Sequence, residues 1–253
     1  MTNDISLILT AHNEAIVAGR TLLAAEKCVQ FAEEHGLSVE KLLILDSPSA
    51  AAAEYFKALP LKDWRIVRVD HRDQSKSRNT GVAMASGKYV AFLDADDLFS
   101  QNWLLYAHRH AEEMQKERDL VVVYPELLWM FEGEKRTKLL FPQDHPFMNP
   151  GLMRTINCYD SLYLTTRDLQ MKFPNLSRDL DRGYAYEDFC WFQQTYLAGV
   201  FHTVAKNTII FKRRRLWSVS IEANKRSSVG PRVDGFTHET VKELRLKHNG
   251  SFF

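Results

Sequence analysis

Three aspartates stand within four positions of one another directly after an apolar run, in the stretch YVAFLDADDLF (Tyr89–Phe99). Carboxylates held this close together repel one another unless a cation or several hydrogen-bond donors compensate their charge. Mg²⁺ and Mn²⁺ prefer oxygen ligands, and proteins commonly hold them with one or two carboxylates and the phosphate oxygens of a substrate. Asp94, Asp96 and Asp97 are therefore candidate metal ligands. The alternative is a strand-to-helix turn in which aspartate serves only as a turn and capping residue.

A second acidic pair, Glu187 and Asp188, stands at the start of a predicted helix that runs to Ala198. A hydroxyl nucleophile must lose its proton as a new bond forms, and a well-placed carboxylate can accept that proton. Neighbouring residues on a helix point about 100° apart, so only one of the two can face a substrate well. The alternative is that both carboxylates only favour the positive end of the helix.

The elements that would position these residues come first in the chain, where residues 5–124 alternate between short apolar runs and helical patterns. The predicted strands cover Ile5–Thr10, Lys41–Asp46, Arg65–Asp70, Lys88–Asp94 and Leu120–Tyr124, and the predicted helices cover Glu14–His35 (capped by Asn13), Ala50–Ala58, Ser75–Ala85 and Asn102–Lys116. Strands separated by helical crossovers indicate a parallel sheet with helices on both faces. Ligands of such sheets bind beyond the carboxyl ends of the strands, so we expect all three aspartates to point into that crevice.

The second half of the chain is less regular. We expect a hairpin that turns near Gly133, a strand over Ser161–Arg167, a strand-rich segment over Val200–Arg215 and a helix over His238–His248. No repeat or low-complexity linker separates these parts. We therefore expect one compact unit over residues 1–253, with a front half of about 1–125, a back half of about 126–217 and a polar tail of about 218–253.

Composition excludes several classes of protein. The formal net charge is +1, which gives no general attraction to nucleic acid. The three cysteines are too few and too scattered for a disulfide framework or a zinc site, so we expect reduced thiols in a cytoplasmic protein. No stretch approaches the ~20 apolar residues of a membrane helix. No G-x-G-x-x-G follows any predicted strand, which argues against a dehydrogenase.

The stretch QSKSRNTGVAMASGKYVAFLDADD (Gln74–Asp97) resembles, nearly position for position, the central signature of the family 2 glycosyltransferases, in which an ARN-x-G helix and a GKY-x-x-FLDADD strand frame a nucleotide-sugar. LILTAHNE, LLILDSPSA and YEDFCWFQQTYLAG resemble further family segments, so the resemblance spans roughly residues 5–200. It implies an α/β GT-A fold, in which a mostly parallel nucleotide-binding sheet is flanked by helices and joined to a smaller mixed acceptor-side region. It also implies a nucleotide-sugar donor, a divalent metal (Mn²⁺ or Mg²⁺) and inversion at the anomeric carbon.

The resemblance also implies roles for individual residues. Asp96 would bind the metal directly, with Asp94 in the metal shell near the ribose. Asp188 would be the general base, with Glu187 beside it. Apart from the resemblance, Trp191 follows this acidic pair closely and supplies aromatic area on which an acceptor sugar ring could stack, although core packing is the commoner role of a tryptophan. The residues expected to contact the nucleotide-sugar are Thr10, His12, Asn13, Glu14, Asp46, Lys76, Arg78, Asn79, Asp94, Ala95 and Arg215.

The chain departs from the family pattern in three places. The family's second strand often ends in two acidic residues, the second of which reads uracil, and here Ser47 takes that second place. UDP stays the favoured nucleotide, and GDP, dTDP and CMP are left open. Relatives often carry a histidine that completes the metal shell, and none stands between positions 202 and 238. The basic segment Lys212–Ser220, with Ser218 and Ser220, only loosely resembles the family segment that closes over the diphosphate.

The sequence thus predicts an inverting, metal-dependent glycosyltransferase that moves a sugar, from a UDP-sugar by preference, to a hydroxyl of a glycan or glycolipid in surface polysaccharide or glycoconjugate synthesis. We expect it in the cytoplasm, with association at the inner face of the membrane left open. A nucleotidyltransferase would usually carry a glycine-rich basic loop after the first strand, which TAHNEAIVAG lacks. A non-catalytic sugar-nucleotide-binding or glycan-binding relative would be expected to lose Asp96 or Asp188, and both are present.

Overall fold

The computed structural model of the chain describes residues 3–61, 63–215 and 225–249. The strands are β1 (Ile5–Ala11), β2 (Val39–Asp46), β3 (Trp64–Val69), β4 (Tyr89–Asp94), β5 (Leu98–Phe99), β6 (Val121–Glu132), β7 (Arg136–Leu139), β8 (Leu164–Thr166) and β9 (Phe201–Arg214). The helices are α1 (Ala15–Glu34), α2 (Ala50–Ala58), α3 (Gln74–Met84), α4 (Trp103–Met114), α5 (Pro150–Thr155), α6 (Arg167–Lys172), α7 (Glu187–Leu197) and α9 (His238–Asn249). Within the described residues the strands form one sheet in the order β3-β2-β1-β4-β8-β6-β9-β5, with β7 paired to β6.

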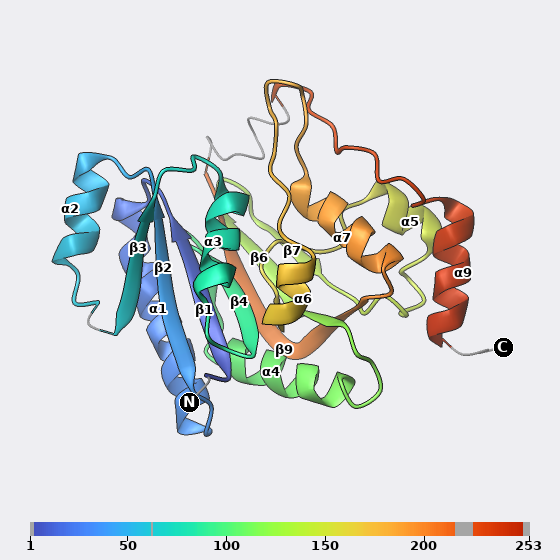
Figure 1. Cartoon of the computed structure of the whole chain (residues 1–253), viewed down its shortest axis with the longest axis horizontal. Coiled ribbons are helices and arrows are strands. Elements are labelled where there is room, and N and C mark those ends of the chain that lie inside the picture. The colour runs from blue at the N-terminus through green and yellow to red at the C-terminus, as the bar shows by residue number, and fades with distance from the viewer. Residues whose placement is uncertain (1–2, 62, 216–224, 250–253) are drawn as a thin grey trace.

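The first four strands run parallel, with β1 between β2 and β4 and with β3 beyond β2. Every residue of β1 is buried, as expected for a strand that is covered on both faces. Figure 1 shows α3 in front of these strands and α1 behind them. The predicted parallel sheet with helices on both faces is therefore confirmed, and the carboxyl ends of its strands meet at one edge.

Helix α3 packs directly onto β1 because Gly81 has no side chain. A Cβ atom at this position would lie 2.4 Å from Cγ2 of the fully buried Ile8. The helix begins at a well-formed cap, in which the side chain of Asp73 accepts a hydrogen bond from the backbone nitrogen of Lys76. Cap and glycine together fix the height and distance of Arg78 above the sheet.

The second half joins the same sheet with mixed strand directions. β8 is antiparallel to both β4 and β6, while β6 and β9 run parallel. The predicted short strand ending at Tyr124 and the first arm of the predicted hairpin are one strand, β6, because the chain continues past Pro125 through an irregularity in its register with β9. The strand predicted over Ser161–Arg167 is confined to Leu164–Thr166, because α6 begins at Arg167.

The predicted helix boundaries are correct at α2 and within one residue at α7 and α9. The predicted cap of α1 is wrong. Asn13 Oδ1 instead accepts a hydrogen bond from the backbone nitrogen of Ser49 at 2.9 Å, and Glu14 takes the N-cap position. Ser218 and Ser220 lie outside the described residues. No helix in the described ranges is both long enough and apolar enough to cross a membrane.

Candidate active site

Asp94, at the carboxyl end of β4, is held in place through one of its two oxygens. Oδ1 accepts hydrogen bonds from Arg78 Nη2 at 2.6 Å, Gln74 Nε2 at 2.7 Å and Thr10 Oγ1 at 3.2 Å. The Arg78 side chain is only 4% exposed, so this ion pair is shielded from water. Arg78 and Thr10, both expected to contact the donor, thus orient Asp94 from two neighbouring elements.

Asp96 lies in the turn after β4 and is paired with Arg215. Its Oδ2 accepts a hydrogen bond from Arg215 Nη2 at 2.5 Å, and the same guanidinium lies 3.6 Å from Glu14 Oε1. Burial and the nearby charge of Asp94 raise the pKa of Asp96, while Arg215 opposes that shift. Arg215, Glu14 and both carboxylates therefore meet at one corner of the sheet edge.

Asp97 does not point into the crevice, so the expectation that all three aspartates do so is wrong. Its backbone nitrogen closes a turn onto the carbonyl of Asp94, and its side chain is buried. Oδ1 accepts a hydrogen bond from the backbone nitrogen of Arg213 at 2.8 Å, and Oδ2 lies 3.6 Å from Lys212 Nζ. Asp97 thus ties the turn to β9.

The donor atoms at this corner fit a divalent cation that also binds phosphate. Asp94 Oδ2 and Asp96 Oδ1 accept no hydrogen bond from any residue that the structure describes. Two free carboxylate oxygens suit Mn²⁺ or Mg²⁺, which complete their coordination with substrate oxygens and water. Across residues 3–61, 63–215 and 225–249, no group of three or more His, Cys, Asp or Glu side chains could hold a metal by itself.

Asp46, predicted to contact the nucleotide, is occupied by the protein's own backbone. Its carboxylate accepts hydrogen bonds from the backbone nitrogens of His71 (2.8 Å), Arg72 (3.0 Å) and Asp73 (3.1 Å), and from Ser77 Oγ (2.8 Å). Burial favours the neutral acid, but these donors outweigh it and lower the pKa of Asp46. Asp46 therefore shapes the loop that leads into α3.

Four further residues that were predicted to contact the nucleotide-sugar lie around β1 and α3. They are His12, Glu14, Ala95 and Lys76. His12 Nδ1 lies 2.6 Å from the Asp46 carbonyl oxygen, and the backbone nitrogen of His12 donates to Glu14 Oε2 at 2.6 Å. Ala95 is buried, and its nitrogen donates to the carbonyl of Thr10. The side chain of Lys76 is exposed to solvent at the start of α3.

Asn79 bonds to a loop of the second half. Its Nδ2 donates to the Asn175 carbonyl at 2.9 Å, and its Oδ1 accepts from the Asn175 backbone nitrogen at 2.8 Å. Asn175 Oδ1 in turn accepts from the Tyr163 hydroxyl at 3.2 Å. This paired contact ties α3 to the far wall of the site, a role that the sequence analysis did not predict.

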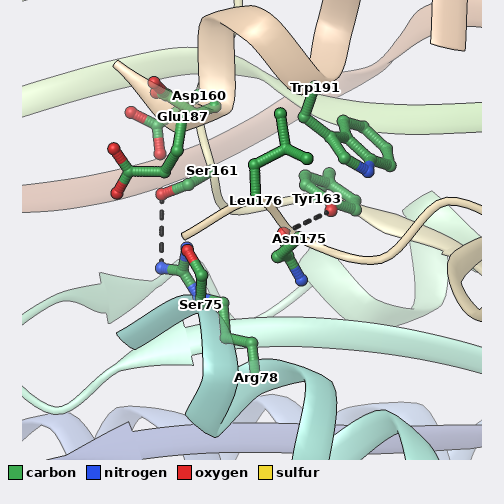
Figure 2. A pocket seen from close by; sticks show the side chains of 10 residues that line it. Ser75, Arg78, Asp160, Ser161, Tyr163, Asn175, Leu176, Glu187 and Trp191 are labelled. Atoms are coloured by element: carbon green, nitrogen blue, oxygen red, sulfur yellow. Dashed lines mark hydrogen bonds between the residues drawn. The ribbon is translucent and has the colours of Figure 1, made fainter. Parts of the chain in front are cut away.

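A small pocket opens between α3 and α7 (Figure 2). Figure 2 shows Ser75 and Arg78 of α3 on one side of it and Asp160, Glu187 and Trp191 on the other. Ser161, Tyr163, Asn175, Leu176 and Asp188 complete its lining. Arg78 Nη2 donates to Ser161 Oγ across the pocket at 3.3 Å. The pocket therefore joins the sheet edge that carries Asp94 to the helix that carries the second acidic pair.

Asp188 is half-buried in this pocket. Its Oδ2 accepts a hydrogen bond from Asn157 Nδ2 at 2.8 Å, which fixes its orientation. Burial, followed by the charges of Asp160 and Glu187, raises the pKa of Asp188. A carboxylate whose pKa lies above the ordinary range is a better proton acceptor at neutral pH.

Trp191 is packed into the core beside the pocket. Its ring stacks on Tyr163 with centroids 4.7 Å apart, and its Nε1 donates to the Phe173 carbonyl at 2.7 Å. Only 2% of the residue is exposed, so little of the ring is open to the pocket. Core packing, the alternative considered for this residue, is what the structure shows.

Sequence reasoning did not single out two further acidic residues, one near Asp46 and one in the pocket. Asp70 ends the third predicted strand, and its Oδ1 accepts a hydrogen bond from Ser47 Oγ at 2.6 Å. Its place at a strand end was a usable signal. Asp160 lines the pocket beside Glu187 and Asp188, but no local pattern marks it.

Comparison with known proteins agrees with this geometry. A family model described as glycosyl transferase family 2 matches residues 6–157, so the chain belongs to that family. An uncharacterised glycosyltransferase of Methanocaldococcus jannaschii is 29% identical over 110 residues, which cover 42% of this chain and 37% of the relative. The succinoglycan biosynthesis protein ExoO of Rhizobium meliloti is 30% identical over 95 residues, which cover 37% of this chain and 26% of the relative. The chain thus matches less than two-fifths of the length of these relatives.

The fold has solved counterparts. The crystal structure of S. aureus TarS 1-349 in complex with UDP-GlcNAc superposes with a TM-score of 0.64 at 15% identity. The match covers 95% of this chain and 65% of that one. At this level of sequence identity the comparison supports a conclusion about the fold alone. It confirms the GT-A fold expected from the sequence.

Proposed function

We propose that the chain transfers a sugar from a nucleotide-sugar donor to a hydroxyl group of a glycan or other acceptor, with inversion at the anomeric carbon and with a divalent metal ion. The observation that carries this proposal is the pocket that Arg78 and Asp188 share. Arg78 is bonded to Asp94 on the donor side, and Asp188 stands at the start of α7 with a raised pKa. One site therefore combines donor-side charges with a proton acceptor.

The donor side would act through charge. Asp94 and Asp96 would hold Mn²⁺ or Mg²⁺, which when bound offsets the negative charge that develops on the leaving diphosphate. Arg215, which lies 2.5 Å from Asp96, would meet a diphosphate through charge-assisted hydrogen bonds. Family membership supports this arrangement.

The acceptor side would act through Asp188. Its carboxylate takes the proton of the acceptor hydroxyl while the acceptor oxygen bonds to the anomeric carbon. The bond from that carbon to the diphosphate oxygen breaks and leaves its electron pair on the oxygen. A single displacement of this kind inverts the anomeric centre, and one base is sufficient for it.

We propose UDP as the nucleotide, and a cell-surface glycan or glycolipid as the acceptor. TarS, solved with UDP-GlcNAc, supports the first choice, and the name of ExoO supports the second. Asp70, held by Ser47, offers a carboxylate to a base N–H near the end of β3. We place the reaction in the cytoplasm, with association at the inner face of the membrane as the alternative.

The experiment is a donor screen. The chain is incubated with UDP-, GDP-, dTDP- and CMP-linked sugars in Mn²⁺, Mg²⁺ or EDTA, and release of the nucleotide is measured with and without acceptor glycans. We expect release from one nucleotide class, loss of that release in EDTA, and a product whose anomeric configuration is inverted by NMR. Release that EDTA leaves unchanged, or a product with retained configuration, would contradict the proposal.

A further inference from the structure

The pocket contains a third carboxylate, Asp160, which the proposed mechanism leaves without a role. Its side chain is 10% exposed and lies just before β8, on the same side of the pocket as Glu187 (Figure 2). Oδ1 accepts hydrogen bonds from Lys212 Nζ at 2.8 Å and from the backbone nitrogen of Leu162 at 3.1 Å. Asp160 is therefore fixed in place and paired with one cation.

That cation is the first residue of the basic cluster that ends β9. Lys212 is 9% exposed, and its Nζ lies between Asp160 at 2.8 Å and Asp97 at 3.6 Å. A buried ammonium is stable only where carboxylates compensate its charge. Lys212 thus faces the interior, joining the turn after β4 to the pocket wall.

Two carboxylates in one pocket compete for a single proton, and their surroundings decide which of them accepts it. Burial alone would raise the pKa of Asp160, but the Lys212 ammonium holds it below its ordinary value. Burial raises the pKa of Asp188, and the charge of Asp160 raises it further. The ion pair therefore separates the proton affinities of two neighbouring acids.

We propose that Lys212 is a positioning residue that decides which carboxylate is the general base, because its ion pair keeps Asp160 ionised and fixed beside Asp188. This inference rests on the proposed function, in which Asp188 receives the acceptor proton. Without the ammonium, the two acids share one proton and neither is a dependable base. Without Asp160, Asp188 loses the negative charge that strengthens it as a base.

Other charged groups also face Asp188, and none of them is substituted in the variants tested below. They are Glu187 on the same helix, Lys138 of β7, whose Nζ donates to the Asn157 carbonyl at 2.6 Å, and Arg78 of α3. Tyr124, Tyr163 and Cys190 are also nearby, and burial raises the pKa of each, so they are neutral near pH 7. Lys212 and Asp160 are the pair whose charges can be removed one at a time.

The test measures the pH dependence of turnover in the full chain, together with the titration of the Asp188 carboxyl carbon by ¹³C NMR, assigned by difference from Asp188→Asn. We expect Asp160→Asn to move the acidic limb and the NMR midpoint to lower pH, and Lys212→Met to move both to higher pH, each by ~1 unit. Lys212→Arg should restore the wild-type position because it keeps the charge. Lys206→Met, at an exposed lysine of the same strand, is the matched control and should change neither.

The opposite directions separate this account from simple damage to the fold. Shifts in the same direction, or no shift in folded variants, would overturn the inference. If Lys212→Met does not fold, the near-isosteric Asp160→Asn decides alone, because it leaves the cation in place. If the NMR midpoint moves as expected and the rate profile does not follow it, Asp188 is not the base. That result would overturn the proposed mechanism, while the charge coupling would stand.

Discussion

Asp94 accepts three hydrogen bonds through one oxygen, whereas Asp96 is paired with Arg215, and Asp188 accepts hydrogen bonds from the Asn157 side chain and the Phe189 backbone nitrogen. These differences matter because a buried carboxylate beside other carboxylates attracts a proton. In the proposed mechanism, aspartate therefore takes two roles: metal binding at the sheet edge and proton transfer in the pocket.

At the residue scale, we expect Asp188→Asn to reduce turnover by about 10²–10⁴-fold, the usual contribution of a general base. The amide keeps the size of the side chain but has no basic oxygen. Nucleotide affinity should stay nearly unchanged, because the residues proposed to bind the donor lie on the sheet edge. Steady-state kinetics and nucleotide titration of the variant measure the two effects.

Two further variants control this result. Glu187→Gln should cost less, because a helix-start carboxylate contributes only about 0.3–1 kcal/mol through the helix dipole. Asp168→Asn, at an exposed first-turn carboxylate of α6, should have wild-type turnover. Should Glu187→Gln be the inactive variant and Asp188→Asn the active one, Glu187 is the base.

At the scale of elements, α3 carries the donor-side geometry. Its cap at Asp73, its close approach at Gly81 and its bond from Asn79 to Asn175 fix it at three points. Arg78 stands between those points, one turn from the glycine, and its guanidinium must reach Asp94 from a set distance. A small displacement of the helix would therefore separate this ion pair.

We expect Gly81→Ala to destabilise the fold by about 1–3 kcal/mol, because a methyl group is forced against the buried Ile8. The better helix propensity of alanine offsets only ~1 kcal/mol of strain. Gly19→Ala is the matched control: its Cβ would meet only the hydroxyl tip of Tyr55, which can move. Urea unfolding measures both variants, and equal stability of the two would contradict the packing argument.

The sequence predicted the elements whose signals are local. β1, β2 and β4 are continuous apolar runs, and α2 is bounded by Ser49 and Pro60, so their positions could be read directly. The six-residue helices α5 and α6 are too short to show a period. β6 could not be read as one strand, because Pro125 interrupts its pattern and the pairing with β9 that continues past this residue is visible only in the folded sheet.

Some residues of the candidate site could likewise be identified from local sequence signals, and others could not. Asp94, Asp96 and Asp188 follow recognisable elements and could be named from the sequence. The sequence could not show whether the Asp97 side chain points into the crevice or into the protein. Its direction depends on the contact with Lys212, which lies 115 positions further along the chain in a different strand. Lys212 and Asp160 were likewise unpredictable, because their pairing joins segments that only the folded sheet brings together.

At the scale of the whole molecule, one sheet carries both sides of the site. β4 supplies Asp94, and β9 supplies Lys212 and ends beside Asp96 through Arg215. Figure 1 shows α3 and α7, from the two halves of the chain, on the same face of this sheet, and the pocket lies between them. The residues proposed to bind the donor and to act on the acceptor are therefore carried by one continuous framework.

The central claim is that Asp94 and Asp96 create a metal-dependent nucleotide site, and thermal unfolding tests it most directly. With UDP at about 100 times its dissociation constant, binding adds about 2.7 kcal/mol, which raises the Tm of a chain this size by roughly 5–10 °C. We predict this rise for the wild type with UDP and Mn²⁺ together, a much smaller one with UDP alone, and none that depends on Mn²⁺ in Asp96→Ala. The exposed Asp168→Ala should behave as the wild type. An equal rise with and without Mn²⁺, or a full rise in Asp96→Ala, would contradict the account.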